Sequence, residues 1–254
     1  PNEKVVDYVL EHYPIDTNDS NDYFGESLVH YAVEYNSNVE VLKILRKKKF
    51  DFSEVSNSGQ TILHFAAHNK NTKILDYILK HHIYKDINEK DNDGWTALHY
   101  AAFYNPNSEI IDLLLKCGAN YKLRTDKGES VLLLASNNNG VEIVNYILQK
   151  KLYEDINEVD NYGWTAFLIC ARFNNEEVLN FLYENGLDWK KKSNYGDSCF
   201  TVAAWNEDLS VIKFIYDYVG CNVPKVLSKK DLNRLKSIPN CEIASYNPPG
   251  ITLN

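Results

Sequence analysis

Short apolar blocks recur along the chain at a nearly constant distance, separated by polar turns rich in Asn, Asp and Gly. One series of blocks follows a glycine and a hydroxyl residue, as in GWTALHYAA, and a second series reads VLKIL, ILDYIL or IIDLLL. Apolar positions three and four residues apart within a block indicate one buried face of a helix. Each period therefore predicts a turn, a short helix, a loop and a second helix.

The turns align on a glycine that is followed two residues later by Ser or Thr. The six glycines are Gly25, Gly59, Gly94, Gly128, Gly163 and Gly196, so successive turns lie 33 to 35 residues apart. A fixed period of this length indicates one supersecondary unit stacked many times. The hydroxyl residues are expected to cap the first helix of each unit by accepting a bond from a free backbone N–H. They are Ser27, Thr61, Thr96, Ser130, Thr165 and Ser198.

The pattern G-x-[ST]-x-L-H-x-A-A, met six times in tandem, resembles the ankyrin repeat family, and the likeness runs from residue 5 to about residue 220. The resemblance implies an all-α fold, an ankyrin-repeat solenoid of helix-turn-helix units joined by β-hairpin loops. It also implies that the histidine of the motif ties neighbouring turns together by hydrogen bonds.

That histidine is present only in the first three repeats, as His30, His64 and His99. In the later repeats its place is taken by Leu133, Leu168 and Thr201. We therefore expect the C-terminal half to be less rigid than the N-terminal half.

We predict a repeat domain over residues 1–222. It opens with a partial repeat at 1–21, whose VVDYVL block matches a second helix, and its full repeats start near residues 22, 56, 91, 125, 160 and 193. After the last repeat, SKKDLNRLKSI carries Ser228 and Asp231 in a capping-box pattern. Residues 223–254 are accordingly predicted to form a C-terminal capping helix that shields the last repeat, followed by an extended tail.

Composition narrows the function classes. With 44% hydrophobic and 24% charged residues among 254, the chain has the balance of a globular protein. A net charge of −8 argues against non-specific nucleic-acid binding, and no apolar run is long enough to span a membrane. The five cysteines are odd in number and form no C-x-x-C pair, which favours buried thiols in a reducing compartment. We therefore expect a cytoplasmic protein.

Motifs that carry chemistry are lacking. NEKDNDG resembles the start of a calcium loop, but the twelfth position is Tyr100 where calcium requires a bidentate Glu. Asp91 and its counterpart Asp160 are better interpreted as turn carboxylates that accept bonds from their own backbone. The G-x-S triplets lack the second glycine of a nucleophile elbow, and no phosphate-binding glycine loop occurs. The sequence therefore predicts no catalytic residue, no metal site and no cofactor.

The residues that indicate a binding surface lie beside each motif glycine and at the end of each predicted first helix. In the family these positions face solvent and vary, so the fold does not require aromatic residues there. Trp, Tyr and Arg are enriched in binding hot spots. An alternative is packing between repeats, with a hairpin Trp lying flat on its neighbour. The predicted partner-binding residues are Trp95, Phe103, Tyr104, Tyr162, Trp164, Arg172, Phe173, Tyr195 and Trp205.

The sequence thus favours a non-catalytic protein–protein interaction module, a monomer that binds a protein partner through its hairpin tips and concave face. An alternative is that the repeats are the targeting or substrate-recognition arm of a larger multidomain protein or enzyme, whose other domain is absent from this chain. A third hypothesis is that the hairpin residues Asn88 or Asn157 are hydroxylated, as some repeats of the family are, and a self-assembling structural role also stays open.

Overall fold

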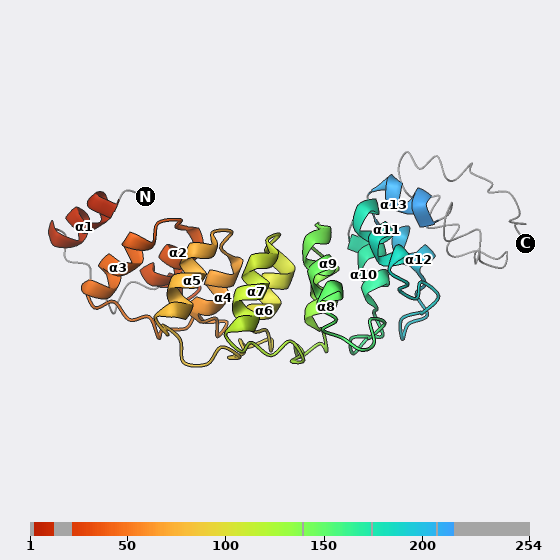
Figure 1. Cartoon of the computed structure of the whole chain (residues 1–254), viewed down its shortest axis with the longest axis horizontal. Coiled ribbons are helices and arrows are strands. Elements are labelled where there is room, and N and C mark those ends of the chain that lie inside the picture. Colours follow the sequence, from red (N-terminus) through yellow and green to blue (C-terminus); the bar gives the residue numbers. More distant parts are fainter. Residues whose placement is uncertain (1–2, 13–21, 139, 174, 207, 216–254) are drawn as a thin grey trace, which may run out of the picture. The chain divides into compact units, whose positions relative to one another are not determined.

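The structure is a computed structural model that describes residues 3–12, 22–138, 140–173, 175–206 and 208–215. The chain divides into two compact units, residues 1–131 and 132–254. Within the described ranges the regular structure is helical and contains no strand (Figure 1). The predicted all-α fold is therefore confirmed.

The first unit consists of paired antiparallel helices that stack on one another. Its helices are α1 (Glu3–His12), α2 (Leu28–Tyr35), α3 (Val39–Lys47), α4 (Ile62–His68), α5 (Thr72–Lys80), α6 (Ala97–Tyr104) and α7 (Ser108–Lys116). The short first helices α2, α4 and α6 pack in one row, and the second helices α3, α5 and α7 pack in another. Helix α1 packs on α3, which is the place of a second helix, as the VVDYVL block predicts.

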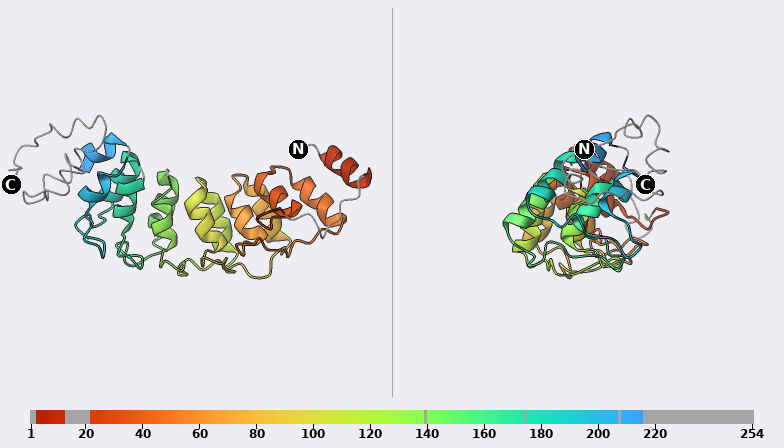
Figure 2. Two further views of the ribbon diagram at one scale, coloured as in Figure 1. Left: turned by 180° about the vertical axis from the view of Figure 1, so that it is seen from behind. Right: turned by 90° about the vertical axis from the view of Figure 1, so that its right-hand side faces the viewer.

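The second unit repeats the arrangement. Its helices are α8 (Val131–Ala135), α9 (Val141–Gln149), α10 (Ala166–Phe173), α11 (Glu176–Glu184), α12 (Cys199–Ala203) and α13 (Leu209–Phe214). Helix α10 packs on α12, and α11 packs on both α9 and α13. In each unit the hairpin turns gather on one side of the helices (Figure 2).

Small residues allow the first helices to approach closely. Ala66 and Ala67 of α4 and Ala101 and Ala102 of α6 are completely buried. Branched aliphatic residues of the second helices, such as Leu42, Ile74 and Leu114, are completely buried as well. The extent of the repeat domain, 1–222, stays a prediction, and the predicted capping helix and tail at 223–254 lie outside the described residues.

Each hairpin turn is closed by the side chain of its first residue. The Asp91 amide donates to the Trp95 carbonyl at 2.8 Å, and the Asp91 carboxylate accepts from the amides of Asp93 and Trp95. Asp160 makes the same set of bonds, so the predicted turn role of both carboxylates is confirmed. Equivalent backbone closures are made by Asp22, Ser56, Thr125 and Ser193.

Successive hairpins are joined by a backbone hydrogen bond that brings them very close. The Asp126 amide donates to the Asp93 carbonyl at 3.0 Å, and three other pairs of hairpins make the same bond. Gly94 follows Asp93 with φ +79°, and a Cβ at Gly94 would lie 2.7 Å from the Asp126 nitrogen. A side chain at this position is excluded both by conformation and by space.

The motif histidines link each repeat to the next hairpin, as the resemblance implies. Nδ1 of His64 accepts the Thr61 amide at 2.9 Å, and its Nε2 donates to the Trp95 carbonyl at 3.1 Å. Accepting at one nitrogen and donating at the other requires a neutral imidazole. His30 and His99 also bond to the next repeat, but at the carbonyls of Glu54 and Leu123, each five residues before the motif glycine of that repeat.

In the later repeats only part of this link is kept. Leu133 and Leu168 are buried aliphatic replacements. Thr201 still caps its own helix, because its hydroxyl accepts the Ser198 amide at 2.8 Å. The expected lower rigidity of this half stays a prediction.

A second link between repeats was missed from the sequence. Asn69 closes α4, and its side-chain amide donates to the carbonyls of Val33 and Asn36 at 2.7 and 2.8 Å. Asn105 makes the corresponding two bonds one repeat later, and in the second unit Asn206 donates to the Ala171 carbonyl. The signal that could have revealed it is an Asn ten or eleven residues after every motif glycine.

We predict that Gly94→Ala lowers the free energy of unfolding by more than the about 1–2 kcal/mol of a left-handed conformation, because the new Cβ would also clash with Asp126. Gly118→Ala is the matched control, since Gly118 also has a positive φ but nothing lies within 4 Å of a Cβ there. Urea denaturation of both variants measures the difference. Equal losses would contradict the close approach of the hairpins.

We also predict that acidification destabilises the fold through its histidines. Burial lowers the pKa of His99 from 6.5 to about 4, and burial likewise lowers the pKa of His64. Protonation then favours the unfolded chain, so the contribution of neutral His99 is complete above pH 6.5. It is lost as pH falls towards 4, by up to about 1.4 kcal/mol per pH unit.

Urea midpoints between pH 7 and 5 measure this slope. The matched variant is His99→Leu, since Leu133 and Leu168 fill the same place in later repeats. This variant should be less stable at pH 7 but should lose less stability on acidification. The same slope in both proteins would show that His99 does not titrate as argued.

Candidate functional site

The first unit brings three of the predicted partner-binding residues together. The Trp95 ring lies 5.5 Å from Phe103 and 6.4 Å from Tyr104, and Phe103 and Tyr104 are 4.6 Å apart. Trp95 belongs to a hairpin and the other two end helix α6. We call Trp95, Phe103 and Tyr104 the first aromatic cluster.

Trp95 is held in place by its own repeat. Its amide is bonded to the Asp91 carboxylate and its carbonyl to His64, and its ring packs against Tyr100 at 5.3 Å. The Tyr100 hydroxyl donates to the second Asp91 oxygen at 2.8 Å, and burial, followed by this bond, raises the Tyr100 pKa. The cluster is therefore preorganised, while the Tyr104 side chain is still 46% exposed.

The second unit holds a cluster built around a cation, which consists of Trp164, Arg172, Phe173 and Trp205. The Arg172 guanidinium lies 4.7 Å from the Phe173 ring centre and 5.3 Å from that of Trp205, and it donates to the Trp205 carbonyl at 2.8 Å. Trp164 stacks on Phe173 at 6.3 Å. Phe173 and Trp205 are 53% and 50% exposed. We call these four residues the second aromatic cluster.

Tyr162 and Tyr195 lie outside that cluster. They occupy the tips of successive hairpins, where their rings stack at 6.4 Å. For this pair the alternative of packing between repeats describes the contact, although Tyr195 is still 74% exposed.

A groove of about 250 Å³ lies beside the first cluster, between helices α2, α4 and α6. Its residues come from three repeats, which is why sequence analysis did not identify it as one site. The Glu34 carboxylate accepts a hydrogen bond from Nδ1 of His68 across it at 2.6 Å. The groove is lined by Glu26, Glu34, Tyr35, Gln60, His64, Phe65, His68, Tyr100 and Tyr104.

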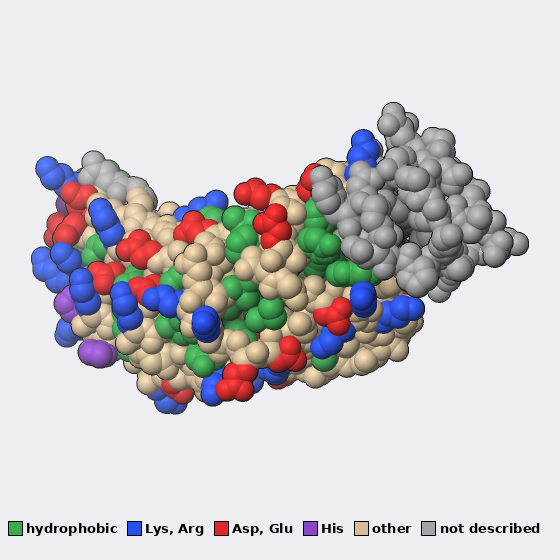
Figure 3. All heavy atoms as spheres, turned by 45° about the vertical axis from the view of Figure 1, so that its right-hand side comes forward, with side chains coloured by type: hydrophobic (Ala, Val, Ile, Leu, Met, Phe, Trp, Pro, Cys, Tyr) green, Lys and Arg blue, Asp and Glu red, His purple; other side chains and the backbone are tan. Residues whose placement is uncertain are grey.

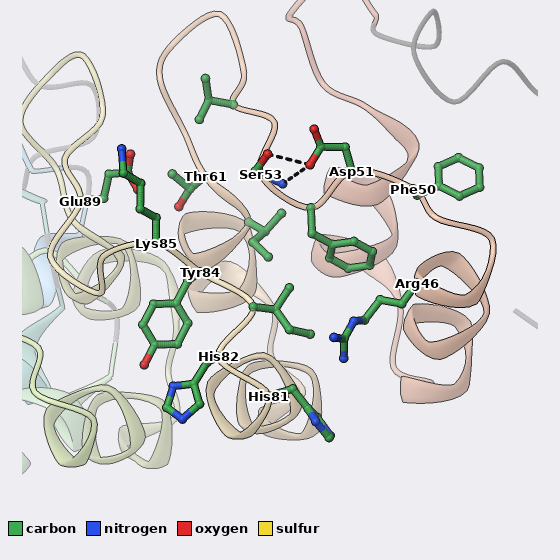
Figure 4. Close-up of a pocket in the computed structure, with 14 residues that line it drawn as sticks. Arg46, Phe50, Asp51, Ser53, Thr61, His81, His82, Tyr84, Lys85 and Glu89 are labelled. Carbon is green, nitrogen blue, oxygen red and sulfur yellow. Dashed lines mark hydrogen bonds between the residues drawn. The ribbon is translucent and has the colours of Figure 1, made fainter.

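A larger cleft of about 760 Å³ lies at the end of helix α5 (Figure 4). Arg46 and Lys85 line it together with Asp51 and Glu89, so the charge at its edge is mixed. The Asp51 carboxylate is engaged by Ser53. The cleft therefore has no clear preference for a ligand of either charge.

His81 and His82 of this cleft point apart (Figure 4). The His81 ring approaches Tyr77, and the His82 ring approaches Tyr84. Among the residues that the structure describes, no group of three His, Cys, Asp or Glu could hold a metal ion. The geometry thus provides no metal centre there.

Of the three cysteines that the structure describes, two are buried as predicted. Cys170 and Cys199 are buried, and burial raises the pKa of Cys199 to about 12. Cys117 is exposed, because it closes helix α7 at its solvent end, so the expectation of a buried thiol is wrong for this residue.

The face of the molecule in Figure 3 carries Lys and Arg interspersed with Asp and Glu, with hydrophobic side chains between them. This mixture differs from the single basic patch of a nucleic-acid binder. Over the described part of the chain, no helix combines the length and the apolar character needed to cross a membrane.

Comparison with known proteins identifies the family to which the repeats belong. A family model described as "Ankyrin repeats (3 copies)" matches residues 1–91, 29–125, 82–160, 102–193 and 132–226. The human transient receptor potential cation channel subfamily A member 1 is 28% identical over 194 residues. A Dictyostelium discoideum protein named as a serine/threonine-protein kinase is 27% identical over 181 residues.

The matches cover 76% and 69% of this chain but only 16% and 21% of those two relatives. A solved structure of a predatory endopeptidase from Bdellovibrio bacteriovorus in complex with an immunity protein contains a similar chain. That chain superposes with a TM-score of 0.60 at 26% identity, and the match covers 76% of this chain and 98% of that one. The overlapping family matches span the six repeats, and this chain belongs to the ankyrin repeat family.

Proposed function

We propose that this chain is a non-catalytic module that binds a partner protein through its two aromatic clusters, on the hairpins and the adjacent ends of the first helices. Ankyrin repeats serve in general as protein-interaction modules. The finer assignment, to these residues of this chain, rests on their side chains and their exposure.

The observation that carries the proposal is the exposure of large aromatic side chains where the fold does not need them. Trp205, Phe173 and Tyr104 are all about half exposed at the ends of first helices, although the same position holds Asn137 in another repeat. Half-exposed rings with a fixed orientation lose little conformational entropy when a partner covers them. These positions can therefore bind without first reorganising.

Arg172 adds specificity to the second cluster. Its guanidinium lies over the rings of both Phe173 and Trp205, and the residue is half-buried, so the cation is already oriented before a partner arrives. Arg and Trp are the side chains most often found to dominate binding energy. A partner that stacks on this cluster would bury the cation together with two rings.

The absence of catalysis is part of the proposal. In His30, His64 and His99 both ring nitrogens are already engaged, Nδ1 at the helix start of the same repeat and Nε2 at a carbonyl of the next repeat. Ser27, Thr61 and Thr96 are engaged at the helix starts, and the family is typically non-catalytic.

A second candidate function is favoured by the comparisons, namely that the module is the targeting or substrate-recognition arm of a larger protein. In the first two relatives, the matching part is a small share of a much longer chain. Sequencing the full transcript tests this candidate. A reading frame that encodes these repeats and no further domain would contradict it.

We predict that Trp95→Ala and Trp164→Ala each weaken partner binding by on the order of 30-fold, because truncating a central aromatic costs about 2 kcal/mol at a hot spot. A protein recovered with the wild-type chain is identified by mass spectrometry and produced in pure form. Its affinity for each variant is then measured by calorimetry.

Tyr77→Ala is the matched control, since Tyr77 is a half-buried aromatic of the second helix α5, outside both clusters. It should leave the affinity unchanged. Wild-type affinity in both tryptophan variants, with an intact helical circular dichroism spectrum, would refute the assigned surface.

A further inference from the structure

The groove between α2, α4 and α6 combines rings with negative charge. Tyr35 and Tyr104 stand at its rim, 69% and 46% exposed, and Phe65 and Tyr100 form more of its wall. Glu26 and Glu34 face the same space, and neither Lys nor Arg is among the lining residues described. The groove therefore favours a ligand that is both positively charged and able to pack on rings.

His64 does not neutralise the charge of the groove. His64 is buried, with its nitrogens bonded to the Thr61 amide and the Trp95 carbonyl, and burial lowers its pKa. His68 approaches one oxygen of Glu34. A carboxylate offers about four acceptor positions, so Glu34 can still accept from a ligand.

A third carboxylate adds to the negative potential. Asp22 accepts the Tyr31 hydroxyl at 2.7 Å, next to the groove. The Glu26 pKa is raised, first by burial and then by the charges of Asp22 and Glu34. A bound cation would relieve this repulsion between like charges.

We propose that this groove receives an arginine side chain of the partner protein, with the guanidinium at Glu34 and Glu26 and its plane against the Tyr104 or Tyr35 ring. This inference rests on the proposed function and names the chemistry of the partner. Arginine fits better than lysine because its planar, weakly hydrated guanidinium both stacks on rings and donates in parallel to a carboxylate.

The test uses small probes on the whole chain. The ¹⁵N-labelled protein is titrated with N-acetyl-arginine methylamide, and its backbone amide shifts are followed. We expect saturable shifts, in the millimolar range, at the amides around Glu26, Glu34 and Tyr104. The citrulline analogue, which has the same shape but no charge, should cause none, and the lysine analogue should bind more weakly.

The matched pair of variants is Glu34→Gln and Glu40→Gln. Both remove one negative charge from the same repeat, but Glu40 lies on α3, where it pairs with Lys43 in solvent. Glu34→Gln should weaken arginine binding about tenfold, since it removes a charge-assisted bond, and Glu40→Gln should not. Should Glu34→Gln fail to fold, Glu26→Gln takes its place.

Three results would overturn the proposal: equal shifts with the citrulline analogue, equal affinity for the lysine analogue, or equal binding by the two glutamate variants. None of them would touch the proposed function. If partner binding still depended on Trp95 while the arginine probe did not bind, the aromatic clusters would stand and only this groove would lose its assignment.

Discussion

Within each unit, hairpins donate a backbone amide to the hairpin before them, and this contact sets the spacing on which the stack depends. The Asp126 amide donates to the carbonyl of Asp93, the residue before Gly94. A Cβ at Gly94 would therefore clash with Asp126, and the φ of Gly94 is positive. The buried histidines and the side-chain amides of Asn69 and Asn105 join neighbouring repeats at other points of the helices. Because three kinds of hydrogen bond hold the repeats together, the residues between them can vary without loss of the fold.

The fold could be predicted from the sequence because these ties recur. A glycine, a hydroxyl and a histidine at one period are visible in a single chain, and they fix the turn, the helix start and the link to the next hairpin. The Asn ten or eleven residues after each motif glycine is just as regular, but isolated Asn residues are common in polar loops, so its period is easily missed. A repeated spacing therefore reveals the residues that the turns, the helix ends and the links between repeats require.

The candidate site was only partly predictable, for the opposite reason. Trp95, Phe103 and Tyr104 could be singled out because they break the pattern, and the structure brings them together. The groove beside them could not be found in this way, since Glu34, His68 and Tyr104 belong to three repeats and each is an ordinary residue in its own context. Only the stacking of α2, α4 and α6 brings these residues together.

Equivalent positions in the two units carry different chemistry on the same backbone. In the first unit, carboxylates lie beside the rings; in the second, Arg172 lies between Phe173 and Trp205. A partner that satisfied both would need a cation for one and a polar or anionic group with an exposed ring for the other. Because such complementarity discriminates between partners more than it adds affinity, the order of charges along the repeats, rather than the amount of aromatic surface, would determine which protein is bound.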